Sequence, residues 1–316
     1  MTARTPAGGS QRVADAPVAN WVDSYAPAAW KPYLKLMRAD RPIGIWLLLF
    51  PCWWSQLLAH LALGQAWIDV WFLALFALGA TVMRGAGCTW NDIVDRDYDG
   101  RVQRTALRPI PAGQVTAKQA LVLAVALSLV GFVVLIQFNW ATIAIGIASL
   151  ALVAAYPFAK RYTYWPQLVL GLTFNWGALV GWAAVTGSVS LAPLALYAGA
   201  VLWTLAYDTI YAHQDAEDDA VLGLKSTALR FGSSTPQWLW AFYGGAILLW
   251  LVAAVAAGAQ FALFVAIAVS AGHFAWQIVT LEIGNAANCL ERFRSNRFIG
   301  WFLAIGLAAE ILLVRF

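Results

Sequence analysis

Long apolar segments alternate with shorter polar ones along almost the whole chain. Nine of the apolar segments approach the roughly 20 residues that a helix needs to cross the hydrocarbon core of a bilayer. They lie near residues 42–63, 67–90, 119–137, 140–158, 166–187, 191–210, 237–257, 261–281 and 298–314. This pattern predicts an all-α polytopic membrane protein, with nine transmembrane helices forming a single bundle around a central cavity.

The segments between these predicted helices differ in length and charge. Eighteen of the 20 Lys and Arg residues lie in 1–41, 91–118, 159–165, 211–236 and 282–297, whereas the four short linkers contain none. Because cytoplasmic loops carry an excess of Lys and Arg, we expect the N-terminus and all the long loops on the cytosolic side. Nine spans then place the C-terminus on the opposite side. The expected location is a bacterial cytoplasmic (inner) membrane.

The first 30 residues differ from the rest of the chain. They are polar, rich in Ala, Pro, Gly and Ser, and contain no apolar core followed by a small-residue cleavage site. They therefore do not resemble a secretory signal peptide. We expect residues 1–30 to form a flexible cytosolic tail and residues 31–316 to form the transmembrane domain.

Composition narrows the class further. Hydrophobic residues make up 61% of the chain and charged residues only 11%, which excludes an ordinary soluble domain and a disordered chain. The three cysteines are an odd number in apolar surroundings, and we interpret them as reduced, buried thiols. The net charge of +4 is spread over separate loops, so no nucleic-acid partner is predicted. No obligate protein partner is inferred, and membrane lipid is the expected surrounding.

Two short segments hold nine of the sixteen acidic residues, and both lie at the cytosolic ends of predicted spans. If the second and sixth spans continue as helices, each segment places its polar residues on one face at i, i+3 and i+7. These residues are Asp92, Asp95 and Asp99 in the first segment and Asp208, Tyr211 and Asp215 in the second. The repeated spacing disfavours the alternative of an ordinary solvated helix end.

Carboxylates that share a face repel one another unless a cation lies between them. Mg²⁺ suits such oxygen ligands and is usually held by a few carboxylates together with substrate phosphates. The hypothesis is therefore a magnesium-dependent site for a prenyl diphosphate, with the metal held by residues from both segments: Asp92, Asp95, Asp99, Asp208 and Asp215.

Basic residues follow each acidic segment. Arg104 and Arg108 could bind phosphate oxygens, although positive charge at this position is also a topology signal. The sequence Gly223-Leu-Lys-Ser-Thr227 resembles the end of a Walker A loop, but the upstream glycine is replaced by Asp218, so a nucleotide site is rejected.

A transporter is the more distant alternative. Ion pathways place ionisable groups near the middle of the membrane, and Asp, Glu and Lys are absent there. His273 is the main polar group deep in a span, and we interpret it as a hydrogen-bonded packing residue. We interpret Gly177 and Gly181, which form a GxxxG pair, as close helix packing within one chain.

The polar segments closely resemble a known signature. Asn91-Asp-x-x-Asp-x-x-x-Asp99, followed by Arg104-Thr-x-x-Arg-Pro109, is similar to the first aspartate motif of the UbiA superfamily of membrane prenyltransferases, and the second acidic segment is similar to that family's second motif. Three further pieces resemble the branch that acts on 4-hydroxybenzoate in ubiquinone synthesis. They are Arg38-Ala-Asp-Arg-Pro-Ile-Gly44, Tyr156-Pro-Phe-Ala-Lys-Arg-Tyr-Thr163, and Tyr207-Asp-Thr-Ile-Tyr-Ala212 with Lys225-Ser-Thr-Ala228.

The resemblance covers residues 31–316 and implies transfer of a polyprenyl chain from its diphosphate to the ring carbon ortho to the hydroxyl of 4-hydroxybenzoate. It implies Mg²⁺ as cofactor, with Asp92, Asp95, Asp208 and Asp215 as catalytic residues. Candidates for the diphosphate are Arg104, Arg108, Arg161 and Lys225. Candidates for the acceptor are Arg41, Asn91 and Tyr211, with Arg161 an alternative for its carboxylate.

Other features of the reaction stay open at the level of sequence. Aromatic residues such as Tyr156, Trp176 or Tyr211 could stabilise an allylic cation. A related prenyltransferase with haem, a chlorophyllide or a naphthoate as acceptor is the nearer alternative, and a transporter or membrane scaffold the more remote one. Prenyl chain length and oligomeric state do not follow from the residues.

Overall fold

The computed structural model describes residues 19–101 and 105–313. Within these ranges every regular element is a helix, and nine stretches are long and apolar enough to cross a membrane. They are Ile43–Ala62, Val70–Asp99, Ala117–Leu135, Trp140–Tyr162, Pro166–Thr186, Leu191–Val221, Thr227–Ala256, Ala262–Val279 and Ala286–Leu313. Each coincides with a predicted apolar segment, so the helical class and the set of spans are confirmed. The protein is an integral membrane protein.

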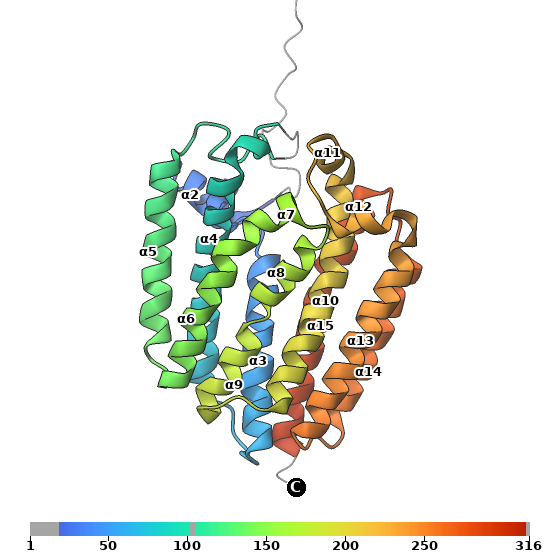
Figure 1. Ribbon diagram of the computed structural model, residues 1–316. Coiled ribbons are helices and arrows are strands. Elements are labelled where there is room, and N and C mark those ends of the chain that lie inside the picture. Colours follow the sequence, from blue (N-terminus) through green and yellow to red (C-terminus); the bar gives the residue numbers. More distant parts are fainter. Residues whose placement is uncertain (1–18, 102–104, 314–316) are drawn as a thin grey trace, which may run out of the picture. The chain divides into compact units, whose positions relative to one another are not determined.

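Several spans consist of more than one helix, and Figure 1 labels the elements in chain order. The helices are α1 (Trp21–Tyr25), α2 (Lys31–Leu36), α3 (Ile43–Ala62), α4 (Val70–Asp99), α5 (Ala117–Leu135), α6 (Trp140–Ala155), the 3₁₀ turn η1 (Tyr156–Phe158), α7 (Ala159–Tyr162), α8 (Pro166–Phe174), α9 (Gly177–Thr186), α10 (Leu191–Ala212), η2 (His213–Asp215), α11 (Ala216–Val221), α12 (Thr227–Phe231), η3 (Gly232–Ser234), α13 (Thr235–Ala256), α14 (Ala262–Val279) and α15 (Ala286–Leu313).

The chain divides into two compact units. The smaller unit combines the described part of Met1–Pro42 with Gly85–Val125, and the larger combines Ile43–Arg84 with the described part of Ala126–Phe316. α4 and α5 each contribute residues to both units. The first acidic segment belongs to the smaller unit and the second to the larger one.

Aromatic packing forms the core of the larger unit. α3 packs against α9 and α15, and α10 packs against α13, which runs beside α14 (Figure 1). Trp54, Trp203 and Trp250 are fully buried where α3, α10 and α13 meet, with ring centroids 5.3–6.2 Å apart. These rings remove a large apolar area from solvent and fix the position of α10, which carries Asp208.

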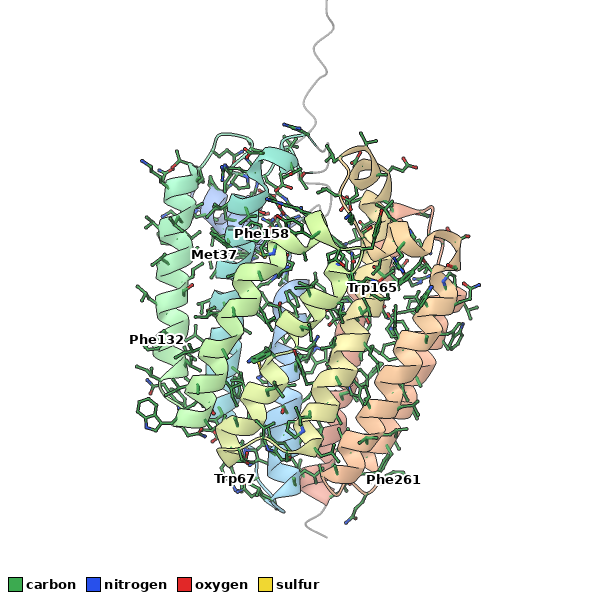
Figure 2. All side chains as sticks on the ribbon, in the orientation of Figure 1. Met37, Trp67, Phe132, Phe158, Trp165 and Phe261 are labelled. Carbon is green, nitrogen blue, oxygen red and sulfur yellow. The ribbon has the colours of Figure 1, made fainter. Side chains whose placement is uncertain are left out.

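The apolar outer surface fits a lipid environment. Phe132 on α5 is 47% exposed and points outward in Figure 2. Trp67 and Phe261 lie at the same end of the larger unit, on opposite sides in the view of Figure 2, whereas Trp165 lies nearer the other end. Such positions suit aromatic rings at the two interfaces of a bilayer.

Glu310, which is buried near the end of α15, has a structural explanation. Its carboxylate accepts hydrogen bonds from the backbone N–H groups of Gln260, Phe261 and Leu263 at the start of α14. These N–H groups have no partner within their own helix, and a negative charge is favourable at a helix N-terminus.

The smaller unit contains helices where the sequence predicted a flexible tail. Residues Trp21–Tyr25 form α1, because Asn20 caps its first turn and Val22 is fully buried. An ion pair of 2.8 Å between Lys35 and Asp23 joins α2 to α1. The structure thus differs from the expected tail boundary at residue 30, and the first 18 residues lie outside its described part.

The two acidic segments differ in local structure. α4 is continuous to Asp99, as predicted, so Asp92, Asp95 and Asp99 lie on one helix. α10 ends at Ala212 and is followed by the 3₁₀ turn η2, which contains Asp215. The predicted helical register therefore holds over the first segment and changes before the end of the second.

Candidate functional site

Asp92 is the centre of an ion-pair cluster in the smaller unit. Its side chain is fully buried, and Arg38 binds both of its oxygens: Nη2 lies 2.6 Å from Oδ1 and Nη1 lies 2.9 Å from Oδ2. Nη1 of Arg108 lies 3.2 Å from Oδ1 and also donates to Oδ2 of Asp99 at 2.7 Å. Two arginines and two aspartates are thereby joined in one network of charge-assisted hydrogen bonds.

Arg38, which sequence analysis did not select, has an unusual backbone. Its φ of 58° makes it the one non-glycine residue with positive φ in the part of the chain that the structure describes. The N–H of Arg38 donates to Lys35 O and the N–H of Ala39 donates to Leu34 O. This is the Schellman arrangement that ends many helices, in which glycine is the usual residue at the left-handed position.

The charges around Arg38 explain its protonation. Burial is the largest single influence and would lower the pKa of Arg38, but the attraction and hydrogen bonds of Asp92 together with the attraction of Cys88 and Asp40 outweigh it, so the pKa lies above its usual value. Burial raises the pKa of Asp40 to about 6, although Arg38 opposes this shift. Arg41, which was predicted to bind the acceptor substrate, lies beside Asp40, with its Nε 3.4 Å from Oδ1 of Asp40.

The other predicted residues of the first segment lie on the same helix. Asp95 is buried and Asn91 is half-buried. Thr105 donates to the backbone carbonyl of Asp99 at 2.9 Å and thereby supports the turn that follows α4. Arg104, a predicted diphosphate residue, lies outside the described residues.

In the larger unit, Asp208 and Asp215 form the second acidic pair. Their carboxylates are close enough to repel each other. Across the residues that the structure describes, the Asp208 carboxylate takes part in no hydrogen bond or ion pair. Tyr211, near the end of α10, packs its ring against Phe293 with centroids 4.6 Å apart.

Arg84 is a second residue that sequence analysis left without a role. Its guanidinium lies over the ring of Phe174 at 4.9 Å, and a Cβ on Gly44 would lie 2.5 Å from its Nε. It attracts Asp208 electrostatically and influences the Tyr207 hydroxyl. No hydrogen bond or ion pair to Arg84 occurs among the described residues. An unpaired cation within a membrane span is a strong indication of a binding site.

The break between α8 and α9 organises the same region. Asn175, fully buried at the break, donates to Thr204 Oγ1 at 2.7 Å, and Thr204 donates to Tyr207 at 3.1 Å. The first of these bonds attaches the break to α10 at Thr204, four residues before Asp208. The break also places Phe174 against Arg84.

The remaining predicted cations lie near α7. Arg161 stacks on Phe158, with 5.1 Å from Cζ to the ring centroid, and Lys225 donates to Tyr162 O at 3.3 Å. The backbone N–H of Lys225 also donates to Lys160 O at 2.9 Å. The structure therefore brings Arg161 and Lys225 into one local region.

Two structural interpretations are confirmed. His273 bonds Ser295 at 3.0 Å, as expected of a packing histidine. Gly177 and Gly181 face α3, where a Cβ would collide with Cys52. Trp176, a predicted aromatic candidate, donates its indole N–H to Ile145 O at 2.8 Å.

The described residues contain no preformed metal cage. In the described ranges, no group of three or more His, Cys, Asp or Glu side chains is arranged to hold a metal ion. Mg²⁺ commonly binds through one or two carboxylates plus substrate phosphates, and it does not require such a cage. The unpaired Asp208 beside Asp215 fits a cation in this way.

The family model and the most similar proteins that were compared agree on one family. The model described as the UbiA prenyltransferase family matches residues 48–304. The mitochondrial 4-hydroxybenzoate polyprenyltransferase of Caenorhabditis elegans is 47% identical over 298 residues, covering 94% of this chain and 83% of that protein. The protein of the same name from Rattus norvegicus is 49% identical over 307 residues, covering 96% and 81%.

Solved structures agree in fold. A UbiA homolog from Aeropyrum pernix K1, in its apo form, has a TM-score of 0.71 at 25% identity, with 84% of this chain and 98% of that chain covered. A UbiA homolog from Archaeoglobus fulgidus bound to GPP and Mg²⁺ has a TM-score of 0.61 at 15% identity, with 89% and 99% covered, and it supports the fold alone. The chain belongs to the UbiA prenyltransferase family.

Proposed function

We propose that this protein transfers a polyprenyl group from a polyprenyl diphosphate to 4-hydroxybenzoate, in a step of ubiquinone biosynthesis. The observation that carries the proposal is the 47–49% identity, over nearly the whole chain, to proteins named 4-hydroxybenzoate polyprenyltransferase. The bond between the allylic carbon and the diphosphate oxygen breaks. A bond forms to the ring carbon ortho to the hydroxyl, and that carbon loses its proton.

The acidic segments are proposed to hold Mg²⁺ and the diphosphate. The ligands are drawn from Asp95, Asp208 and Asp215, together with Asp99 through the oxygen that Arg108 does not bind. Asp92 is left out of this set, because both of its oxygens bind guanidinium groups. When bound, Mg²⁺ would neutralise negative charge that develops on the departing diphosphate.

Cationic side chains are proposed to share the binding of the diphosphate. Arg108 is held at the first acidic segment, and Arg161 and Lys225 lie together in the larger unit. Arg104 completes this predicted set. A guanidinium matches phosphate oxygens with two parallel hydrogen bonds, whereas Lys acts as a point charge.

Arg84 is proposed as the receptor for the carboxylate of 4-hydroxybenzoate, beside the earlier candidates Arg41 and Arg161. Unlike Arg41, which lies against Asp40, Arg84 has no ion-pair partner among the residues described. We expect Arg84→Gln to raise the KM for 4-hydroxybenzoate roughly tenfold or more, as loss of a charged hydrogen bond would, with less effect on the KM for geranyl diphosphate. Steady-state kinetics with each substrate varied in turn measure both values, and equal effects would contradict this role.

The membrane orientation is also part of the proposal. The distribution of Lys and Arg supports a cytosolic N-terminus and cytosolic polar loops. We propose a bacterial cytoplasmic (inner) membrane as the location, whereas the relatives named above are mitochondrial.

Acceptor choice tests the proposed function. Purified protein is incubated with geranyl diphosphate, Mg²⁺ and one acceptor at a time: 4-hydroxybenzoate, a dihydroxynaphthoate or haem. We expect mass spectrometry to detect a C-prenylated product with 4-hydroxybenzoate alone. Prenylation of another acceptor in its place would support the sister-enzyme alternative and overturn this assignment.

A further inference from the structure

The surroundings of Asp92 are unfavourable for a metal ion. Arg38 and Arg108 donate three hydrogen bonds to its two oxygens, all within 3.2 Å, and the side chain is fully buried. A divalent cation at the same carboxylate would face two positive guanidinium groups at short range. Asp92 thus differs from Asp208, whose carboxylate has no ion-pair partner in the described part of the chain.

The position of Arg38 is fixed by its backbone as well as by Asp92. The left-handed φ of 58° follows from the Schellman end of α2, and Nη1 also donates to Lys35 O at 3.0 Å. A non-glycine residue held in this conformation indicates that the side chain has a purpose at the site. In this structure the side chain forms a bidentate pair with Asp92.

Arg108 has one side occupied and one side available. Its Nη1 bridges Asp92 and Asp99, at 3.2 and 2.7 Å. Its Nε and Nη2 have no acceptor among the residues that the structure describes. These two N–H groups form the edge of a guanidinium that binds phosphate oxygens in pairs.

We propose that Asp92 is a positioning residue and not a metal ligand: with Arg38, it holds Arg108 so that the free edge of Arg108 binds the diphosphate of the prenyl donor. The inference rests on the proposed function and refines it, because it separates Asp92 from the carboxylates that serve the metal. Arg38 fixes Asp92, and Asp92 with Asp99 fixes Arg108.

Kinetics of matched variants test this separation. Asp92→Asn, Asp95→Asn and Arg38→Gln are compared in purified protein, with geranyl diphosphate and Mg²⁺ each varied. For Asp92→Asn and Arg38→Gln we expect the KM for geranyl diphosphate to rise roughly tenfold, with half-saturating Mg²⁺ changed by less than about twofold. For Asp95→Asn we expect half-saturating Mg²⁺ to rise roughly tenfold. A tenfold rise in half-saturating Mg²⁺ for Asp92→Asn, with an unchanged KM for geranyl diphosphate, would overturn the proposal.

Two controls separate positioning from loss of fold. Asp97→Asn makes the same change on the same helix at a side chain that is 74% exposed, and it should leave both constants unchanged. The double variant Arg38→Gln/Asp92→Asn should raise the KM no further than either single change, because both disrupt one network. Additive effects would show independent roles and contradict the proposal.

A binding measurement does not depend on the reaction. Thermal stability of the detergent-solubilised protein is followed with Mg²⁺ alone and with Mg²⁺ plus inorganic diphosphate. Asp92→Asn should keep the rise in Tm with Mg²⁺ and lose most of the additional rise with diphosphate, whereas the opposite pattern would refute the positioning role. If wild-type protein binds diphosphate in this way but prenylates no acceptor, the proposed function fails and the role of Asp92 stands.

Discussion

At the scale of single residues, burial outweighs charge attraction at Asp40, just before the start of α3. Asp40 is 2% exposed, and its nearest cation, Arg41, is at 3.4 Å, longer than the bonds that Arg38 makes to Asp92. Burial therefore dominates over attraction at Asp40, and its pKa rises to about 6. A carboxyl group with a raised pKa makes stability depend on pH in a known direction.

The pH dependence of stability should reveal this residue. Between pH 4 and 6 the folded protein keeps a proton on Asp40 that the unfolded chain has released, so the contribution of Asp40 to stability is present below its unfolded pKa and is lost as pH rises through about 6. Asp40→Asn should therefore gain stability relative to wild type between pH 5 and 7.5, by on the order of 1–3 kcal/mol. Thermal unfolding of both proteins across this range measures the difference. A difference that stays constant with pH would contradict the account.

At the scale of elements, small residues allow close helix approach where the core needs it. A Cβ on Gly181 would collide with the backbone carbonyl of Cys52 and lie 3.1 Å from the backbone nitrogen of Gln56. Both atoms belong to the backbone of α3 and cannot turn aside. The contact between α9 and α3 therefore depends on the absence of a side chain at this position.

Alanine substitutions test this contact. Gly181→Ala should destabilise the protein by about 1–3 kcal/mol, as overpacking in a close-packed core does. Gly272→Ala on α14 is the matched control, because nothing lies within 4 Å of its added Cβ, and it should be neutral or slightly stabilising. Thermal unfolding in detergent compares the two variants. Equal stability of both would show that α9 and α3 can separate without cost.

At the scale of the whole molecule, the charged loops support the proposed orientation in the membrane. The nine spans within the described residues are joined by linkers that are alternately long and basic or short and free of Lys and Arg. This asymmetry supports the proposal that both acidic segments lie on the cytosolic side.

Cysteine labelling in a cysteine-free background tests the orientation. Ser188 lies between α9 and α10, and Gly284 lies between α14 and α15; both are exposed. A membrane-impermeant maleimide should label Gly284→Cys from the cytosolic face alone and Ser188→Cys from the opposite face alone. Labelling of both residues from one face would contradict nine alternating spans.

Hydropathy predicted the spans because each membrane helix must hydrogen-bond its own backbone N–H and C=O groups and present apolar side chains to lipid. It also located both acidic segments, which stand out against an apolar chain. Arg38 and Arg84 were given no site role from the sequence, for physical reasons. The left-handed turn at Arg38 is usually marked by glycine, and the contact of Arg84 with Phe174 joins residues 90 positions apart. The helical register is lost before Asp215 because η2 interrupts the α-helix there, and the spacing of apolar residues did not predict this 3₁₀ turn.

The proposed reaction is a metal-dependent prenyl transfer to 4-hydroxybenzoate. The most direct measurement is product formation in liposomes with geranyl diphosphate and 4-hydroxybenzoate, first with Mg²⁺ and then with excess EDTA, followed by mass spectrometry. We predict one C-prenylated product that disappears with EDTA and returns when Mg²⁺ is restored. Product formation that continues unchanged in EDTA, or no product from folded protein that binds both substrates, would contradict the account.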